Sequence, residues 1–448
     1  MTITVSSTSS DQEKMLASRL IQRSYIKLVA SSLCEKVQMA EGAGLTAYFV
    51  RYKRMNVPLS TITEGVEPSE SSFTLDTQTV TLDQWGDIIY VSDKSQLTTK
   101  HPLIEQCVKL LADNAARVMD REVQLVLLAN TNVQYFDGSV TTRDTLTSAM
   151  RINDTVLQKA RITLVNDGAP ARGGPSGDAK AQEASGSVNQ GSAYVAVCGP
   201  EVISDIMRPS ASMGSFASVA MYANQKALYN SEVGTWLGFR WVETNFIPRF
   251  VLFGTTTLAS TFAAGAGCGL TGLTIANPAS GGTISNATDY MKVTRKDLLR
   301  GFEEAISIEH TITPAAGASQ SLTFANTGTL YAFNVYLGTV TGILYLAAEN
   351  ILPGTTATVT AIPTSGTAAP TNINSADTSL TTVHVVYIFA EEAVNWVGFY
   401  NAQSYITADQ STVGNVLRLK RGIGFKFFGK AMVRDSTRLL RIELAAQQ

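Results

Sequence analysis

Two β-strand candidates decide the fold of this chain: residues 45–54, LTAYFVRYKR, and residues 74–91, TLDTQTVTLDQWGDIIYV. Both are rich in aromatic and β-branched residues, and the segment between them carries Pro58, Gly65 and Pro68. This pattern predicts a long hairpin, or ribbon. A ribbon of two strands has too little core to be stable alone, so it must lie on another surface.

Charged residues are sorted along this ribbon, with basic side chains on its first strand and acidic side chains between the strands. One interpretation is a solvated edge whose charges prevent aggregation. The other is a joint between two copies of the chain, in which the acidic segment lies on a basic surface of the neighbouring copy. The candidate inter-subunit contacts are Arg51, Lys53, Arg54, Glu64, Glu67 and Glu70.

Residues 102–128, PLIEQCVKLLADNAARVMDREVQLVLL, carry apolar side chains at three- and four-residue spacing, which predicts an amphipathic helix. Pro102 and Glu105 suit its first turn, and no later Gly or Pro interrupts it. At 1.5 Å per residue the helix is about 40 Å long. That length indicates a strut rather than a helix of a small domain.

Other segments are predicted from the same kinds of signal. Residues 12–30 suit an amphipathic helix that packs either on its own domain or, as an arm, on a neighbouring subunit. Residues 165–191 are rich in Gly, Ala and Ser and indicate a surface loop. Residues 416–444 alternate and predict a hairpin that closes a sheet. The remaining predictions are helices at 142–162, 199–206 and 289–305, a strand at 193–197, and a turn followed by a strand at 229–243.

Residues 310–390 differ from the rest of the chain, because their only charged side chains are Glu349 and Asp377. Short β-type runs separated by turn residues predict a small all-β domain, for which an Ig-like sandwich is one arrangement. The insertion spans residues 256–382. The predicted strands are 321–324, 330–337, 342–346, 356–362 and 382–389.

Composition limits the class of protein. The 448 residues are 45% hydrophobic and 16% charged, with a formal net charge of −2. This balance argues against a nucleic-acid binder with a basic surface and against a long disordered chain. No run of about 20 apolar residues predicts a membrane span. The four cysteines lie far apart and predict buried, reduced thiols: Cys34, Cys107, Cys198 and Cys268.

The sequence contains few of the residue patterns that are typical of catalytic or metal sites. His101, His310 and His384 are far apart in the sequence, whereas a metal site or a triad needs partners nearby. Residues 267–272 match GxGxxG, but Pro278 follows where a phosphate-facing helix should be. We therefore predict no catalytic residues, no metal and no cofactor, and expect that the protein is not an enzyme.

Five segments carry a resemblance to a known family. They are PLSTITEGVEP at 58–68, LDQWGDIIYVSD at 82–93, AYVAVCGPEVISDI at 193–206, ALYNSEVGTWLGFRWVET at 227–244 and KFFGKAMVRDSTRLLRIELAA at 426–446. In this order they resemble the N4 gp56-like major capsid proteins of tailed bacteriophages, which have the HK97-type fold. The resemblance covers most of residues 12–255 and 383–448, and the β insertion matches less clearly.

The resemblance implies an α+β, HK97-like capsid fold with an inserted all-β domain. The ribbon would be the extended loop that overlaps a neighbouring subunit, and the helix at 102–128 would be the spine helix. The implied parts are an N-terminal arm at 1–44, the extended loop at 45–97, the spine helix and peripheral domain at 98–192, part of the axial domain at 193–255, the insertion at 256–382, and closing axial and peripheral strands at 383–448.

The implied function is self-assembly into the icosahedral head shell of a tailed phage, enclosing double-stranded DNA. The implied partners are further copies in hexamers and pentamers, portal, scaffold and decoration or cement proteins, and DNA bound without sequence specificity, but no membrane. The protein would be made in the host cytoplasm and reside in the virion. Rival interpretations are a tail-tube, baseplate or other self-assembling virion structural protein, an enzyme with an Ig-like accessory domain, and a carbohydrate-binding module in the insertion.

Basic residues near the C-terminal end alternate with Phe425, Phe427 and Phe428. Such a composition occurs in surfaces that bind single-stranded nucleic acid, but a half-buried sheet with one solvated face accounts for it better. In a weaker functional interpretation the strand faces packaged DNA without reading its sequence. The candidate residues of this DNA-facing or structural strand are Lys420, Arg421, Lys426 and Lys430.

Overall fold

The structure is a computed structural model in which the chain forms two compact units. Unit 1 contains Met1–Ser24, Ala30–Val126 and Glu392–Asp435, and unit 2 contains Tyr25–Val29, Leu127–Glu391 and Ser436–Gln448. The structure describes residues 2–3, 28–40, 42, 44–52, 55, 57, 61, 72–98, 103–172, 193–208, 217–218, 231–252, 273–276, 289–306, 309–312, 320–324, 331–352, 355–369, 382–406 and 419–446.

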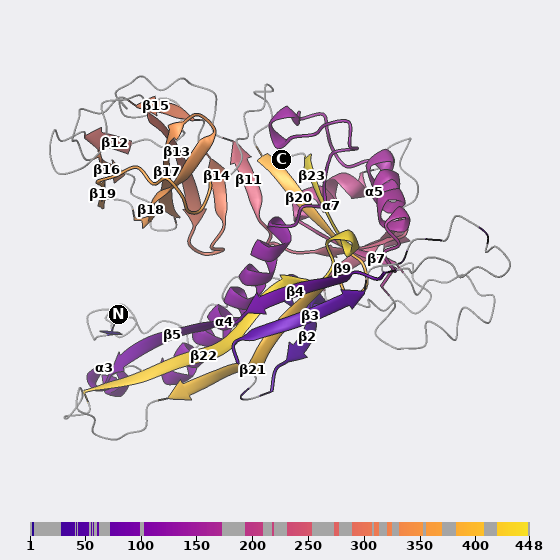
Figure 1. The fold of residues 1–448 in the computed structure, drawn as a ribbon. Coiled ribbons are helices and arrows are strands. Elements are labelled where there is room, and N and C mark those ends of the chain that lie inside the picture. Colours follow the sequence, from indigo (N-terminus) through magenta and orange to yellow (C-terminus); the bar gives the residue numbers. More distant parts are fainter. Residues whose placement is uncertain are drawn as a thin grey trace. The chain divides into compact units, whose positions relative to one another are not determined.

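Unit 1 is built on an elongated five-stranded sheet (Figure 1). Its centre consists of long antiparallel strands, with β22 paired on one side to β5 and on the other to β21. Two short strands pair in parallel at the edges. In spatial order the strands are β1 (Thr2–Ile3), β5 (Asp83–Ser92), β22 (Lys420–Val433), β21 (Val394–Ile406) and β2 (Glu35–Gln38).

The predicted strut is confirmed as α4 (Leu103–Leu128), which follows the short helix α3 (Asp93–Thr98). Its apolar stripe is buried, including Cys107, Leu111 and Ala115. The Asn114 side chain donates a hydrogen bond of 2.9 Å to Asp87 on β5, so α4 lies on the face of the sheet to which Asp87 points.

Helix α4 also contacts α2 (Ala30–Leu33), through the buried carboxylate of Asp120. Asp120 accepts hydrogen bonds from the backbone N–H of Ser31 at 2.8 Å and from the Gln124 side chain at 2.8 Å. Burial raises the pKa of Asp120 despite these hydrogen bonds. Most of the helix predicted at 12–30 lies outside the described residues.

The predicted ribbon is observed only in part. Strands β3 (Thr46–Tyr52) and β4 (Leu75–Thr81) form an antiparallel hairpin, as expected. The expectation of one strand over 74–91 is wrong, because the strand divides at Leu82 and its second part, β5, belongs to the long sheet. The reason is that Gly44, with a φ of +84°, turns the partner strand away, so the chain beyond Thr81 needs a new partner.

Unit 2 contains a large mixed sheet of thirteen described strands. Its main path, in spatial order, is β18 (Ile343–Ile351), β17 (Tyr331–Val340), β13 (Asp289–Asp297), β14 (Glu303–Ile306), β11 (Arg249–Leu252), β20 (Thr382–Phe389), β7 (Tyr194–Cys198), β10 (Phe239–Glu243), β9 (Glu232–Trp236) and β8 (Ala217–Ser218). Strands β15 (His310–Ile312), β23 (Leu439–Ala445) and β6 (Val133–Tyr135) pair beside that path.

Helices α5 (Asp154–Asn166) and α7 (Pro200–Met207) pack in one apolar core with β7, β10, β20 and β23. The helix predicted at 142–162 corresponds to α5, but its predicted start at residue 142 is wrong. Asn153 has an extended backbone, and its side chain accepts a hydrogen bond from the N–H of Val156 at 2.9 Å, which caps the helix at this point. Residues Arg143–Thr145 before it form a 3₁₀ turn.

The helix predicted at 289–305 is also wrong, since this segment forms β13 and β14. Met291 and Val293 alternate into a buried core, which is the period of a strand. After β13 the Asp297 carboxylate accepts hydrogen bonds from the N–H groups of Leu299 and Arg300, and Gly301 takes a positive φ of 76°. These features make a turn where a helix was expected.

The insertion contains strands at all the predicted positions. A three-stranded sheet of β12 (Leu273–Ala276), β16 (Gln320–Phe324) and β19 (Thr356–Val359) accompanies the end of the large sheet formed by β13, β17 and β18. Val359 of β19 shares a core with Met291 and Phe333, so the described strands form two packed layers. The strand predicted at 382–389 is β20, which pairs instead with β7, β11 and β23.

The hairpin predicted at 416–444 is wrong. Strand β22 belongs to the sheet of unit 1, whereas β23 pairs with β20 and β6 in unit 2. Residues alternate between buried and partly exposed along β22, but every residue of β23 is buried. A strand that is buried on both faces needs a sheet covered on both sides, which the elongated sheet does not offer.

Asp289 gives a prediction about pH. It is fully buried, and neither of its carboxylate oxygens has a hydrogen-bond partner among the described residues. Burial raises its pKa to about 6. Because the folded-state pKa exceeds the ordinary one, the stabilising contribution is full below about pH 4, decreases as the pH rises, and is lost above about pH 6.

We therefore expect Asp289→Asn to stabilise unit 2 by up to about 3 kcal/mol at pH 7 and to have almost no effect at pH 4. Calorimetric unfolding of both proteins at the two pH values measures this difference. The other titrating groups contribute equally to both proteins, so they cancel when the two unfolding free energies are subtracted. A difference that is the same at pH 4 and pH 7 would therefore contradict a raised pKa for Asp289.

Candidate functional site

The β3–β4 hairpin presents an apolar surface that its own unit leaves uncovered. Tyr48, Val50 and Tyr52 alternate along β3 and are 68%, 56% and 69% exposed. Leu75 on β4 lies opposite Tyr52, and the rings of Tyr52 and Phe73 are 5.7 Å apart. We call these five residues the outer face. Contiguous exposed apolar side chains of this kind mark a surface that binds another molecule.

The opposite face of the same hairpin is covered. Ala47, Phe49 and Val80 pack with Val397 of β21 and Met432 of β22. The hairpin therefore lies on the long sheet through one face, and its alternation makes the other face apolar as well. A hairpin that is apolar on both faces needs two surfaces, of which the subunit supplies one.

Arg51 fixes the open end of the hairpin. Its guanidinium donates a hydrogen bond of 2.9 Å to Asp76 on β4 and another to Asp435, just after β22. The hydrogen bond with the buried Asp435 raises the pKa of Arg51. Arg51, a predicted inter-subunit contact, thus makes these ion pairs within the subunit. The other predicted contacts lie outside the described residues: Lys53, Arg54, Glu64, Glu67 and Glu70.

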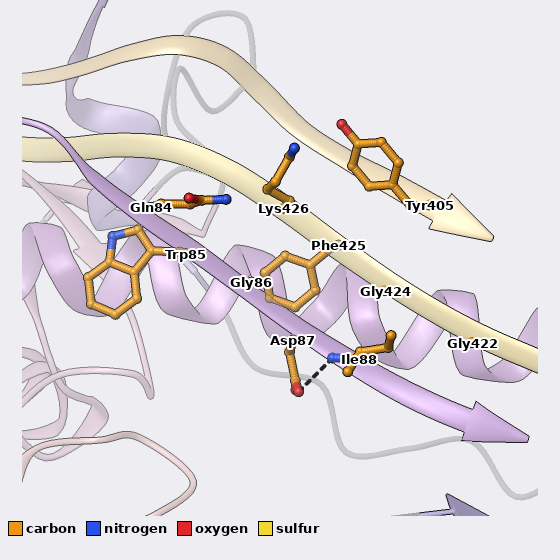
Figure 2. Close-up of a pocket in the computed structure, with 10 residues that line it drawn as sticks. All are labelled: Gln84, Trp85, Gly86, Asp87, Ile88, Tyr405, Gly422, Gly424, Phe425 and Lys426. Carbon is orange, nitrogen blue, oxygen red and sulfur yellow. Dashed lines mark hydrogen bonds between the residues drawn. The ribbon is translucent and has the colours of Figure 1, made fainter. Parts of the chain in front are cut away.

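A groove of about 670 Å³ lies over β5, β22 and β21 in unit 1 (Figure 2). Its floor contains the backbone of Gly86, Gly422 and Gly424, and we call it the glycine trough. Gln84, Ile88, Tyr405 and Lys426 surround this floor, and Figure 2 shows Tyr405 and Lys426 on the same side of the sheet. The trough is open and shallow, and suits an extended chain better than a compact small molecule.

Two of these glycines are required by the sheet. A Cβ on Gly86 would lie 2.8 Å from the carbonyl oxygen of Phe425, and one on Gly424 would lie 2.9 Å from that of Asp87. A side chain at either position would push β5 and β22 apart. Because these glycines have no side chains, the floor of the trough consists of backbone at these positions.

Lys426 lines the trough, whereas Lys420 lies farther along β22, and each of these lysines lies over an aromatic ring. The Nζ atom of Lys426 is 5.2 Å from the centroid of the Tyr405 ring, and that of Lys420 is 5.0 Å from the Tyr90 ring. These distances suit cation–π contacts, which hold the ammonium groups in place.

The other two residues of the predicted basic strand are arranged differently. Lys430 makes an ion pair of 2.7 Å with Asp83. Arg421 is half-buried and lies out of phase with the three lysines, so it points to the opposite face of β22. The half-buried sheet expected here is observed, and Phe425 and Phe427 stack on its buried face. DNA binding by this strand stays a prediction.

The histidines do not form a site in the described residues. Nδ1 of buried His384 lies 4.0 Å from Oε2 of Glu201, and the other carboxylate oxygen, Oε1, accepts a hydrogen bond of 3.1 Å from Arg249. Burial lowers the pKa of His384. His101 and the GxGxxG segment at 267–272 lie outside the described residues. Across the described ranges, no cluster of three or more His, Cys, Asp or Glu side chains could hold a metal ion.

The described helices include none that is long and apolar enough to cross a membrane. Cys34, Cys107 and Cys198 are buried, as predicted. The outer face and the glycine trough are the candidate binding surfaces considered among the described residues.

Comparisons with known proteins identify the fold. No protein-family model and no curated protein matches the chain. Among solved structures, the capsid of Ralstonia phage GP4 is similar with a TM-score of 0.51 and 11% identity, over 97% of this chain and 96% of that chain. The chain has a phage capsid fold. The capsid of cyanophage Pam1 is similar over 98% of this chain and 97% of that chain, with a TM-score of 0.50 and 8% identity.

At such low identity the likeness establishes the fold alone. It extends over nearly the full length of both capsid chains, so most of the insertion is included in the aligned length. This agreement confirms the α+β capsid fold that the sequence predicted.

Proposed function

We propose that the chain is a major capsid protein that assembles into the icosahedral head shell of a tailed bacteriophage and encloses double-stranded DNA. The observation that carries this proposal is the outer face, because an uncovered apolar hairpin face requires a partner. The capsid fold makes another copy of the same chain the natural partner.

The proposal includes the HK97-like assignment of parts and the N4 gp56-like kinship. The β3–β4 hairpin and the residues between its strands would be the extended loop, and α4 the spine helix. Unit 1 would supply the peripheral domain and unit 2 the axial domain. Residues 256–382 would be an Ig-like insertion on this framework.

Shell assembly needs many modest contacts repeated around each copy. A specific interface commonly buries about 800 Å² on each partner. A hairpin with one exposed apolar face adds such area without thickening the wall, and its exposed strand edges can also pair. Hexamers and pentamers would both use these contacts. Portal, scaffold and decoration proteins and packaged DNA complete the proposed set of partners, and the shell of the virion is the proposed location.

Electron microscopy of the expressed, purified protein tests this function. We expect closed shells of uniform diameter, formed alone or with a scaffold protein. Tubes of uniform width would instead support a tail-tube protein. Solitary particles at every concentration, with and without scaffold, would contradict a self-assembling role.

A further inference from the structure

A buried cluster of charged side chains in unit 2 carries more positive than negative charge. It lies on the face of β20 and β23 opposite to the apolar core that contains α5 and α7. Arg143, Arg441 and Glu443 are 7%, 7% and 0% exposed, and the two guanidinium groups share the one carboxylate. A buried charge without a counterion is costly, so the surplus positive charge favours a further negative partner.

The surplus charge belongs mainly to Arg441. Arg143 donates two hydrogen bonds to the Glu443 carboxylate, at 2.5 and 2.7 Å. The Nε atom of Arg441 lies 3.1 Å from Oε1 of Glu443, but this contact is not a hydrogen bond. Its Nη1 atom donates to the carbonyl oxygen of Leu128, the last residue of α4. The C-terminus of a helix carries about half a negative charge, which compensates Arg441 only in part.

The hydroxyl of Tyr387 belongs to the same cluster. Tyr387 lies opposite Arg441 in the pairing of β20 with β23, so the two side chains share one face of the sheet. Burial raises the pKa of Tyr387, so the hydroxyl keeps its proton and can donate it. Neither this buried hydroxyl nor the Nε–H group of Arg441 has a hydrogen-bond acceptor among the described residues.

We propose that unit 2 binds a small monovalent anion, chloride, beside Arg441, with the Tyr387 hydroxyl and the Arg441 Nε–H group as its donors. An anion accepts both hydrogen bonds and neutralises the surplus charge. A water molecule could accept the same hydrogen bonds, but it would leave the charge uncompensated and bring two further donors into the site. A metal cation would be repelled by both guanidinium groups. Glu443 repels an anion, but Arg143 already neutralises that carboxylate.

The site is placed where three elements meet. Arg441 joins β23 to the last turn of α4, and Tyr387 belongs to β20. A bound anion therefore fixes the end of α4 on the sheet of unit 2. Because the site exists only in folded unit 2, binding increases the stability of that unit.

The chloride dependence of stability tests the proposal on unassembled subunits. Hydrogen exchange is followed by mass spectrometry at pH 7 while sodium chloride replaces sodium gluconate at constant ionic strength, because gluconate is too large for a buried site. We expect the protection of β20 and β23 to increase with chloride, approaching about tenfold for each tenfold increase above the dissociation constant. Strand β22 of unit 1 should show no such increase.

A conservative variant ties this effect to the site. Tyr387→Phe removes one donor and keeps the ring, so we expect chloride binding to weaken about tenfold and protection to increase only at correspondingly higher chloride. The matched control is Tyr194→Phe, because Tyr194 is a buried tyrosine of unit 2 whose hydroxyl donates a hydrogen bond of 2.9 Å to the carbonyl oxygen of Ala169. This control should lose protection equally at every chloride concentration.

Equal protection in chloride and in gluconate would overturn the proposal and assign the two donors to an ordered water. The same chloride dependence in the wild type and in Tyr387→Phe would overturn it as well, since a general salt effect would then explain the result. Crystals grown in sodium bromide provide a readout that needs no variant. An anomalous peak within hydrogen-bond distance of the Tyr387 hydroxyl and Arg441 Nε would support the site, and bromide bound only elsewhere would overturn it.

Discussion

Closed shells are expected to disappear when Tyr48, Val50 and Tyr52 are all replaced by Thr, while the subunit stays folded. The three side chains are exposed, so their loss costs the subunit little, and Thr suits a strand. In an assembled shell each would contribute about 1.5–3 kcal/mol on full burial. Losing all three should weaken each contact by about a thousandfold or more.

Light scattering and negative-stain microscopy measure the assembly, and circular dichroism checks the fold. The matched control is Val340→Thr/Ile343→Thr, which changes exposed apolar residues of another hairpin, between β17 and β18. Normal shells from the triple variant would show that the outer face is not an assembly contact. Loss of shells in the control as well would mean that assembly responds to any lowered surface hydrophobicity.

The largest loss of stability is expected from Glu443→Gln. Glu443 on β23 is fully buried and accepts two hydrogen bonds from Arg143, at 2.5 and 2.7 Å. It also lies 3.1 Å from the guanidinium of Arg441, while that of Arg143 lies 3.6 Å above the ring of Phe250. One carboxylate thus balances two buried cations.

Removing that charge leaves both guanidinium groups buried without their counterion, which should cost about 3–5 kcal/mol. Urea unfolding of unassembled subunits measures the change. Glu105→Gln is the control, because it breaks an exposed pair with Lys109 on α4 and should leave the midpoint unchanged. A midpoint for Glu443→Gln equal to that of the control would show that the buried network contributes little.

Elements whose signal is local could be predicted from the sequence. The apolar stripe of α4 and the continuous apolar run of β7 decide their own structure, and both were predicted nearly to the residue. In residues 289–305, charges every three or four residues resemble the pattern of a helix. Strand β13 is instead decided by pairing with β17, about forty residues later, which no local pattern reveals.

The candidate site was only partly predictable for the same reason. The alternation of Tyr48, Val50 and Tyr52 is visible in the sequence, but which face is covered depends on Val397 and Met432, more than 300 residues away. The trough needs the register of β5 against β22, which places Gly86 opposite Lys426 and Ile88 opposite Gly424. The lysines are visible in the sequence, but the role of the glycines between them depends on that register.

The pairing of early with late strands has a consequence for the timing of synthesis. β5 requires β22 as its neighbour, and β20 requires β23, so the sheets of both units include segments translated after residue 419. Neither sheet can be completed while the ribosome is still translating the insertion, residues 256–382, because β22 and β23 follow it in the chain. In the proposed shell, subunits would become competent to join one another only after residue 445 has been translated, so that nascent chains on the same messenger RNA would not associate prematurely.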